Sequence, residues 1–192
     1  MRPCRLVFSM IVIVGTLIAY TLAAPFVVFP KAGELVSPDR RFVVRNAERE
    51  GSAFDFAGTF RSLWLIEVAT GRSRKLCDYL GVAAVAWSSN DFLVVTQYVS
   101  KKTSRALIFP VAVTKDPVML DKSTLIQLVP MELRPALREN DHVFVEALRV
   151  EQDTLYLRVW GYGQHDAQGF RWHCEYDLRG DSVSCTEERS SR

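Results

Sequence analysis

The sequence has few of the residues on which catalytic and metal sites are usually built. It contains three histidines and four cysteines in 192 residues, and their spacing matches no zinc-ligand pattern. It has no Gly-x-Ser-x-Gly elbow, no glycine-rich phosphate loop and no His-Glu-x-x-His segment. We therefore predict no catalytic residue, no metal site and no cofactor, and favour a non-catalytic protein over an enzyme.

An excess of charge is also missing. The chain has 24 basic and 22 acidic residues, and two of the basic ones, Arg2 and Arg5, precede the long apolar segment at the N-terminus. Without that segment the two signs are equal in number. Proteins that bind nucleic acid usually carry a clustered excess of lysine and arginine, so we predict no nucleic-acid partner.

The N-terminus carries an export signal. Residues 6–30 contain no charged side chain. Thr21 and Ala23 suit the small-residue positions of a cleavage site, but the uncharged run also exceeds the roughly 20 residues that span a bilayer. We predict a signal peptide or an uncleaved signal-anchor helix over residues 1–30. The rest of the chain is then periplasmic, secreted or anchored to the membrane by this segment.

Downstream of residue 30 the pattern is almost all strand. Alternating segments rich in β-branched and aromatic residues predict strands at residues 42–44, 63–68, 83–87, 92–99, 106–113, 143–150, 154–160 and 170–178. One short helix is predicted at residues 131–140, where Pro135 limits its regularity. The sequence predicts one all-β, antiparallel extracytoplasmic domain over residues 31–192.

The segment "LWLIEVATGRSRKL" is the clearest hairpin. Gly71 is free to take the positive φ that a three-residue loop with a bulge requires. Along the first strand Trp64 and Ile66 point to one side and Leu63 and Leu65 to the other. We expect the side that carries Trp64 to face the core.

The same order of strands recurs three times. "SPDRRFVV" and "LWLIEVATGRSRKL" form the first unit, "VAWSSNDFLVV" opens the second, and "VFVEALRVEQDTLYLRVWGYG" opens the third. The first two units resemble blade segments of the bacterial TolB-type β-propellers, whose repeats often read Ser-Pro-Asp-Gly before a strand. Arg40 stands where that family usually has glycine, and the third unit matches in strand order only.

The resemblance implies a binding scaffold, but the chain is short for a ring. Closed propellers have about 4–8 blades, and only three units can be counted. A partial propeller and a sandwich-like domain both stay open. Two copies that together complete a six-unit ring, a homo-oligomer, are a further hypothesis.

Cys174 and Cys185 flank the last predicted hairpin symmetrically, with the four-residue loop 178–181 between its strands. This register places them at a non-hydrogen-bonded pair, where the distance suits a disulfide. Cys77 has no evident partner and no nearby catalytic signature, so we expect an inert thiol.

Aromatic residues bracket the polar, glycine-rich loop 161–169. Aromatic side chains on paired strands are usually part of the core, but such a loop also suits recognition. The candidate binding surface consists of Trp160, Tyr162, His165, Asp166, Phe170 and Trp172.

The sequence thus predicts an exported, non-catalytic β module of the bacterial cell envelope that binds a protein or glycan partner and contacts the membrane through residues 1–30 if these are not removed. The alternative is a small exported hydrolase or hydrolase inhibitor that uses loop 161–169.

Overall fold

The structure is a computed structural model that describes residues 25–48, 60–89, 91–112, 116–163 and 168–188. These residues form mostly β structure, as predicted, with two short α-helices. Of the predicted N-terminal segment, residues 1–24 lie outside the described part, and Val27–Phe29 form strand β1. In the part of the chain that is described, no helix has the length and apolarity needed to cross a bilayer.

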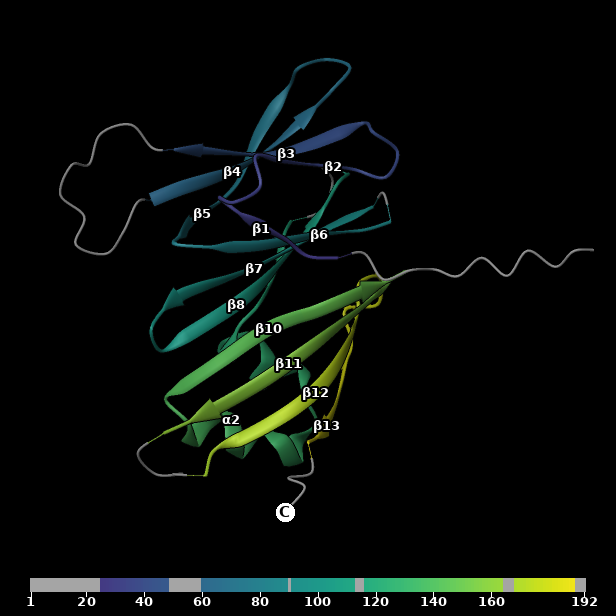
Figure 1. Cartoon of the computed structure of the whole chain (residues 1–192). Helices are drawn as coiled ribbons and strands as arrows, with labels where there is room; N and C mark the ends of the chain where they lie inside the picture. The colour runs from purple at the N-terminus through teal and green to yellow at the C-terminus, as the bar shows by residue number, and fades with distance from the viewer. Residues whose placement is uncertain (1–24, 49–59, 90, 113–115, 164–167, 189–192) are drawn as a thin grey trace, which may run out of the picture.

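The remaining strands follow one another in three groups (Figure 1). We call them unit 1, unit 2 and unit 3. Unit 1 contains β2 (Glu34–Val36), β3 (Phe42–Glu48), β4 (Phe60–Glu67) and β5 (Ser73–Leu80). Unit 2 contains β6 (Ala83–Ser88), β7 (Phe92–Ser100), β8 (Thr103–Pro110) and β9 (Val118–Leu120). Unit 3 contains β10 (His142–Glu151), β11 (Thr154–Tyr162), β12 (Phe170–Asp177) and β13 (Val183–Glu187).

Within each unit the strands pair in chain order and antiparallel. Unit 1 is a separate four-stranded sheet, whereas β1 and units 2 and 3 form one nine-stranded sheet. The larger sheet is mixed, because β8 and β10 meet as a parallel pair at Thr103 and Val143. The prediction of a purely antiparallel domain was therefore wrong at this one junction.

A shared hydrogen bond relates the three units. In each, the first residue after the third strand donates its backbone N–H to the carbonyl of the residue just before the second strand. The three bonds, each 2.8 Å long, are Val68 to Arg41, Val111 to Asp91 and Leu178 to Asp153. Among the residues that the structure describes, each first turn also contains one non-glycine residue with positive φ, namely Arg40, Ser89 and Gln152. The repeated order of strands is thus accompanied by repeated turn geometry.

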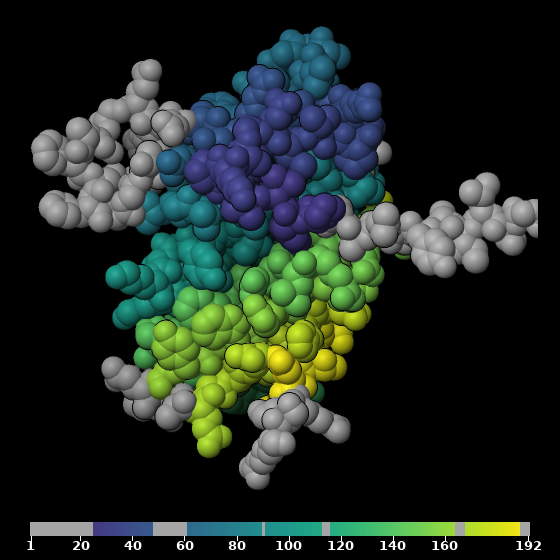
Figure 2. Space-filling view, in the orientation of Figure 1, coloured from purple at the N-terminus to yellow at the C-terminus, as the bar shows by residue number. Residues whose placement is uncertain are grey.

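Unit 2 lies between the other two units (Figure 2). Because side chains alternate along a strand, one face of β6–β8 packs on unit 1 and the opposite face packs on unit 3 and the helices. Leu93 and Val95 belong to the first core, and Phe92 and Val94 to the second. Both faces of these strands are therefore apolar and buried, which explains the near-continuous hydrophobic run of β7.

Three hydroxyl groups of unit 2 hold β10 and the turn that follows it in place. The Ser104 hydroxyl of β8 donates to the Val145 carbonyl and accepts from the Val145 N–H, both at 2.9 Å. On β7, Thr96 accepts from the Ala147 N–H at 3.3 Å. On β6, Ser88 donates to the Gln152 carbonyl. All three side chains are buried. β10 thus crosses unit 2 through side-chain hydrogen bonds instead of a full strand ladder.

The helices lie behind the strands of unit 3 (Figure 1) and contribute Leu125 and Leu137 to the core that units 2 and 3 share. Helix α1 (Lys122–Leu128), which the sequence did not predict, begins after Asp121, whose carboxylate accepts the Thr124 N–H at 2.9 Å. The predicted helix at residues 131–140 is present as a 3₁₀ turn, η1 (Met131–Leu133), followed by α2 (Arg134–Glu139). Pro135 lies in the first turn of α2, where its missing N–H is tolerated.

The first predicted hairpin has the expected turn but the opposite core face. Gly71 has φ of +70°, and its N–H donates to the Glu67 carbonyl at 2.8 Å. Leu63 and Leu65, however, are the buried residues, and Trp64 is half-buried on the other side. Our prediction that the Trp64 side faces the core was wrong, because unit 2 packs on the leucine side.

The predicted disulfide joins Cys174 of β12 to Cys185 of β13, whose Cα atoms are 4.1 Å apart. Asp177 donates to the Ser182 carbonyl and accepts from the Asp181 N–H where this hairpin closes. Cys174 lies three residues before Asp177 and Cys185 three residues after Ser182, so the cysteines form a non-hydrogen-bonded pair, as predicted. Disulfides persist in oxidising compartments. The bond therefore points to an extracytoplasmic environment.

Candidate functional site

The candidate site is the face of unit 3 that points away from the helices, which we call the outer face. In Figure 1 strands β10–β12 lie in front of the helices, so the outer face is turned toward the viewer. Side chains of a strand point alternately to its two faces. Because Val143, Val145 and Val159 point to the core, their neighbours along the strands point outward. The outer face comprises His142, Phe144, Glu146, Tyr156, Arg158, Trp160, Tyr162, Arg171, His173 and Glu175.

One end of the outer face is an aromatic cluster. Phe144 and Trp160 face each other across β10 and β11 and stack with 4.0 Å between ring centroids. Tyr162 lies parallel to both rings at 6.1 Å, and Tyr98 of unit 2 meets Phe144 edge-on at 6.5 Å. Tyr98 is 52% and Tyr162 41% exposed. The cluster thus presents two exposed tyrosines on a packed aromatic base.

His142 completes the aromatic cluster. Its ring meets Tyr162 edge-on with 4.6 Å between centroids. Its buried Nδ1 atom has no hydrogen-bond partner among the described residues. Because this atom is closed to solvent, His142 contributes its ring to the packing of the cluster, and its Nδ1 offers no donor or acceptor to a ligand.

The other end of the outer face is polar and its charges are paired. Arg158 binds the Glu146 carboxylate at 2.6 Å, and Glu188 lies 3.6 Å from the Arg171 guanidinium and 3.5 Å from His173. The Arg149 guanidinium lies 3.9 Å above the Tyr156 ring. A hollow of about 330 Å³ adjoins these groups, lined among others by Arg149, Tyr156, His173, Glu175, Ser184 and Thr186. Its hydrogen-bonding groups carry little net charge.

The structure separates the residues of the predicted binding surface. Trp160 and Tyr162 lie together on the outer face. Trp172 is 2% exposed and packs in the core with Phe170, 4.3 Å between their centroids. His165 and Asp166 lie outside the described residues.

Sequence reasoning missed Phe144 and Tyr98. Phe144 could have been identified from the sequence, because the turn after residue 151 sets the register that places Phe144 opposite Trp160. Tyr98 belongs to another unit, and no local pattern indicates that β10 crosses close to it.

The described residues contain no group of three or more potential metal ligands among their histidines, cysteines and acidic residues. Cys77 is half-buried and unpaired, and burial raises the pKa of its thiol to about 12. Such a thiol is almost wholly protonated at neutral pH, so it is a poor nucleophile.

No family model, no curated protein and no solved structure matches this chain.

Proposed function

We propose that the protein is an exported, non-catalytic binding module whose outer face takes a neutral glycan. The observation that supports this proposal is that the outer face has exposed tyrosines at one end, Tyr162 and the neighbouring Tyr98 of unit 2, and a polar hollow at the other. Aromatic rings pack against the apolar faces of sugar rings, and convergent polar side chains fix the orientation of a ligand.

The charges on the outer face favour an uncharged ligand. Arg158 is paired with Glu146, and Arg171 with Glu188. An acidic glycan or a nucleic acid would meet as many carboxylates as guanidinium groups. A polyhydroxyl compound, in contrast, can accept from the arginines and donate to the glutamates without separating either pair.

The proposal extends to the fold and the location of the protein. We propose that the three units are propeller-like blades stacked in an open series, as the repeated turn bonds suggest. Residues 1–30 would export the chain and, if uncleaved, hold it at the membrane. The alternative of a hydrolase or hydrolase inhibitor depends on loop 161–169, and no described contact favours it.

Isothermal titration with chitotetraose, cellotetraose and maltotetraose tests the glycan proposal. We expect saturable binding of at least one of them, weakened about tenfold by Tyr162→Ala or Tyr98→Ala because each removes an exposed ring. Met131→Ala is the matched control, since Met131 is 75% exposed and lies in η1, away from the outer face.

Equal affinities for the tyrosine variants and the control would contradict the site. If none of the sugars binds, and an envelope protein instead binds in a manner that depends on Tyr98 and Tyr162, the outer face is a protein interface and the glycan proposal is wrong.

A further inference from the structure

A second site lies where β8 changes partners. Thr103 of β8 pairs with Val143 of β10, whereas Ala106 pairs with Leu120 of β9. Between these two points β9 and β10 diverge, and a cleft of about 340 Å³ opens beside Ser104 and Arg105. Its volume falls in the range of small-molecule sites, which is roughly 300–1,000 Å³. The cleft is independent of the outer face.

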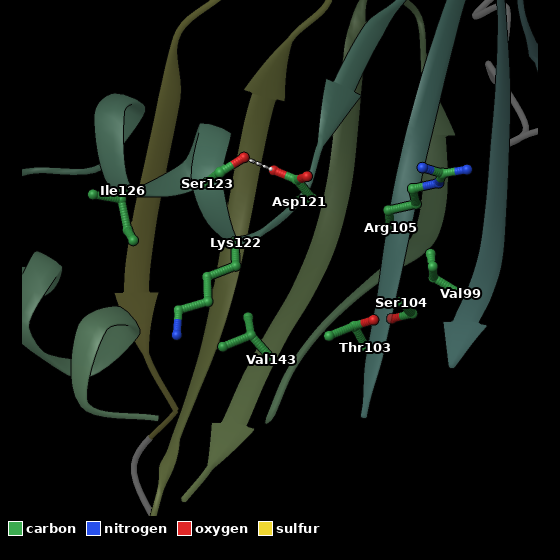
Figure 3. A pocket seen from close by; sticks show the side chains of 9 residues that line it. All are labelled: Val99, Thr103, Ser104, Arg105, Asp121, Lys122, Ser123, Ile126 and Val143. Atoms are coloured by element: carbon green, nitrogen blue, oxygen red, sulfur yellow. Dashed lines mark hydrogen bonds between the residues drawn. The ribbon is translucent and has the colours of Figure 1, made fainter. Parts of the chain in front are cut away.

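The wall of the cleft is mainly apolar. Val99 comes from β7, Ile126 from α1 and Val143 from β10, and the hydroxyls of Thr103 and Ser104 lie between them (Figure 3). Val99 is 47% exposed although its side chain is apolar. Covering an exposed apolar side chain beside an apolar cleft with a hydrophobic ligand is favourable, because apolar surface is removed from water.

The cation of the cleft is Lys122. It projects from α1, whereas the Arg105 guanidinium of β8 points away from it (Figure 3) and donates to the Met119 sulfur at 3.3 Å. The Lys122 ammonium donates one bond, to the Asn140 carbonyl at 2.8 Å, and its other two N–H groups are available. Lys101 and Lys102 are exposed at the adjoining β7–β8 turn.

The single carboxylate of the lining is already engaged. One oxygen of Asp121 accepts from the Ser123 hydroxyl at 2.7 Å and from the Thr124 N–H at 2.9 Å. Asp121 therefore caps α1, and Lys122 is the charged side chain of the lining that keeps N–H groups for a ligand. The position favours a negative group on the ligand.

We propose that this cleft binds a single-chain anionic amphiphile such as a medium-chain fatty acid. The alkyl chain lies against Val99, Ile126 and Val143, and the carboxylate is held by Lys122. Apolar walls beside one ammonium group match the two parts of such a molecule, whereas a sugar would leave the walls without an apolar partner.

Titration of the folded protein with dodecanoate, below its micelle concentration, tests this proposal. We expect saturable binding, and much weaker binding of acetate, which lacks the chain, and of dodecanol, which lacks the charge. Val99→Asp and Lys122→Gln should each weaken dodecanoate binding about tenfold or more. Because Val99 is largely exposed, its variant keeps the fold even if the Lys122 variant does not.

Matched controls come from unit 1. Val68 is 57% exposed in the β4–β5 turn, and Lys75 is an exposed cation of β5, so Val68→Asp and Lys75→Gln should leave the affinity unchanged. Equal effects of the Val99 and Val68 variants would overturn the proposal, as would the absence of saturable binding.

Sedimentation with phosphatidylglycerol vesicles separates the free amphiphile from a membrane. Vesicle binding without dodecanoate binding would identify a membrane contact and overturn the cleft proposal. Tyr162→Ala should not change dodecanoate binding, so failure of the glycan proposal leaves this result intact.

Discussion

At the scale of single residues, Ser104 is the most informative side chain. Its hydroxyl serves both the N–H and the carbonyl of Val145, and both residues are buried. Ser104→Ala leaves two buried backbone groups unpaired, and each such group costs about 1–3 kcal/mol. We expect the free energy of unfolding to fall by about 2 kcal/mol or more in urea titrations.

The control for this prediction is Ser184→Ala, because Ser184 is an exposed serine of β13. Its effect should stay within about 0.5 kcal/mol. A similar small effect for Ser104→Ala would mean that the hydroxyl is not needed to hold β10.

Cys77 allows a test of reactivity. Burial raises the pKa of its thiol to about 12, so at pH 8 the folded protein should react with Ellman's reagent about a thousandfold more slowly than the unfolded protein. A Cys77→Ala/Ser73→Cys variant places a thiol at an exposed position of the same strand and should react quickly. Fast modification of native Cys77 would contradict its assignment as an inert thiol.

Asp39 should make the free energy of unfolding depend on pH. Hydrogen bonds from Ser37 and Arg41 lower the pKa of its carboxyl to about 2. A lowered pKa in the folded state means that the carboxylate stabilises the fold above its unfolded pKa of about 3.8, and that this contribution is lost as the pH falls toward 2. Asp39→Asn should therefore destabilise the protein at pH 6 and have little effect at pH 2, measured by urea unfolding. A penalty that is independent of pH would contradict this linkage.

At the scale of elements, the last hairpin depends on its disulfide. Cys174 and Cys185 are separated by 11 positions, and closing so short a loop stabilises the fold by at most about 3 kcal/mol. The Cys174→Ser/Cys185→Ser variant should fold with a free energy of unfolding lower by no more than that amount. Dithiothreitol should lower the stability of the wild type but not that of the variant; a variant that fails to fold would show that the bond does more than hold one hairpin.

The elements that the sequence predicted are those whose signals are local. Gly71 and the register of Cys174 with Cys185 follow from turn length, and alternation locates the long strands. The core side of β4 depends on which sheet packs on it, and neither Trp64 nor Leu65 carries that information. Helix α1 was missed because its seven residues are mostly polar and only Leu125 is fully buried.

The candidate site also contains residues that a local sequence pattern places and residues that only contacts between units place. Trp160 and Tyr162 lie two positions apart on one strand, so alternation places them on one face, whereas Phe170 and Trp172 point to the core of the same unit. Tyr98 and the cleft beside Ser104 arise from the crossing of β10 over unit 2, and contacts between units have no local signature in the sequence.

At the scale of the whole molecule, unit 2 contributes one face to each of the two cores. Neither core can be lost without exposing apolar strands of unit 2, so the described domain should unfold in one transition. Tryptophan fluorescence reports on Trp64, Trp87, Trp160 and Trp172, which lie in all three units, and should give the same midpoint in urea as far-ultraviolet circular dichroism. Two separated midpoints would show that the units unfold independently.

The hydroxyl groups of unit 2 that bond β10 and its turn also determine how unit 3 is placed. A continuous backbone ladder sets strand direction but allows neighbouring strands to slip by two residues while keeping the same faces. Thr96 and Ser104 bond β10 itself, and Ser88 bonds Gln152 in the turn after it, so hydroxyls on three different strands of unit 2 fix the position of β10. Part of the placement of unit 3, and with it the contact of the aromatic cluster with Tyr98, is thus set by three hydroxyl side chains in the sequence of unit 2.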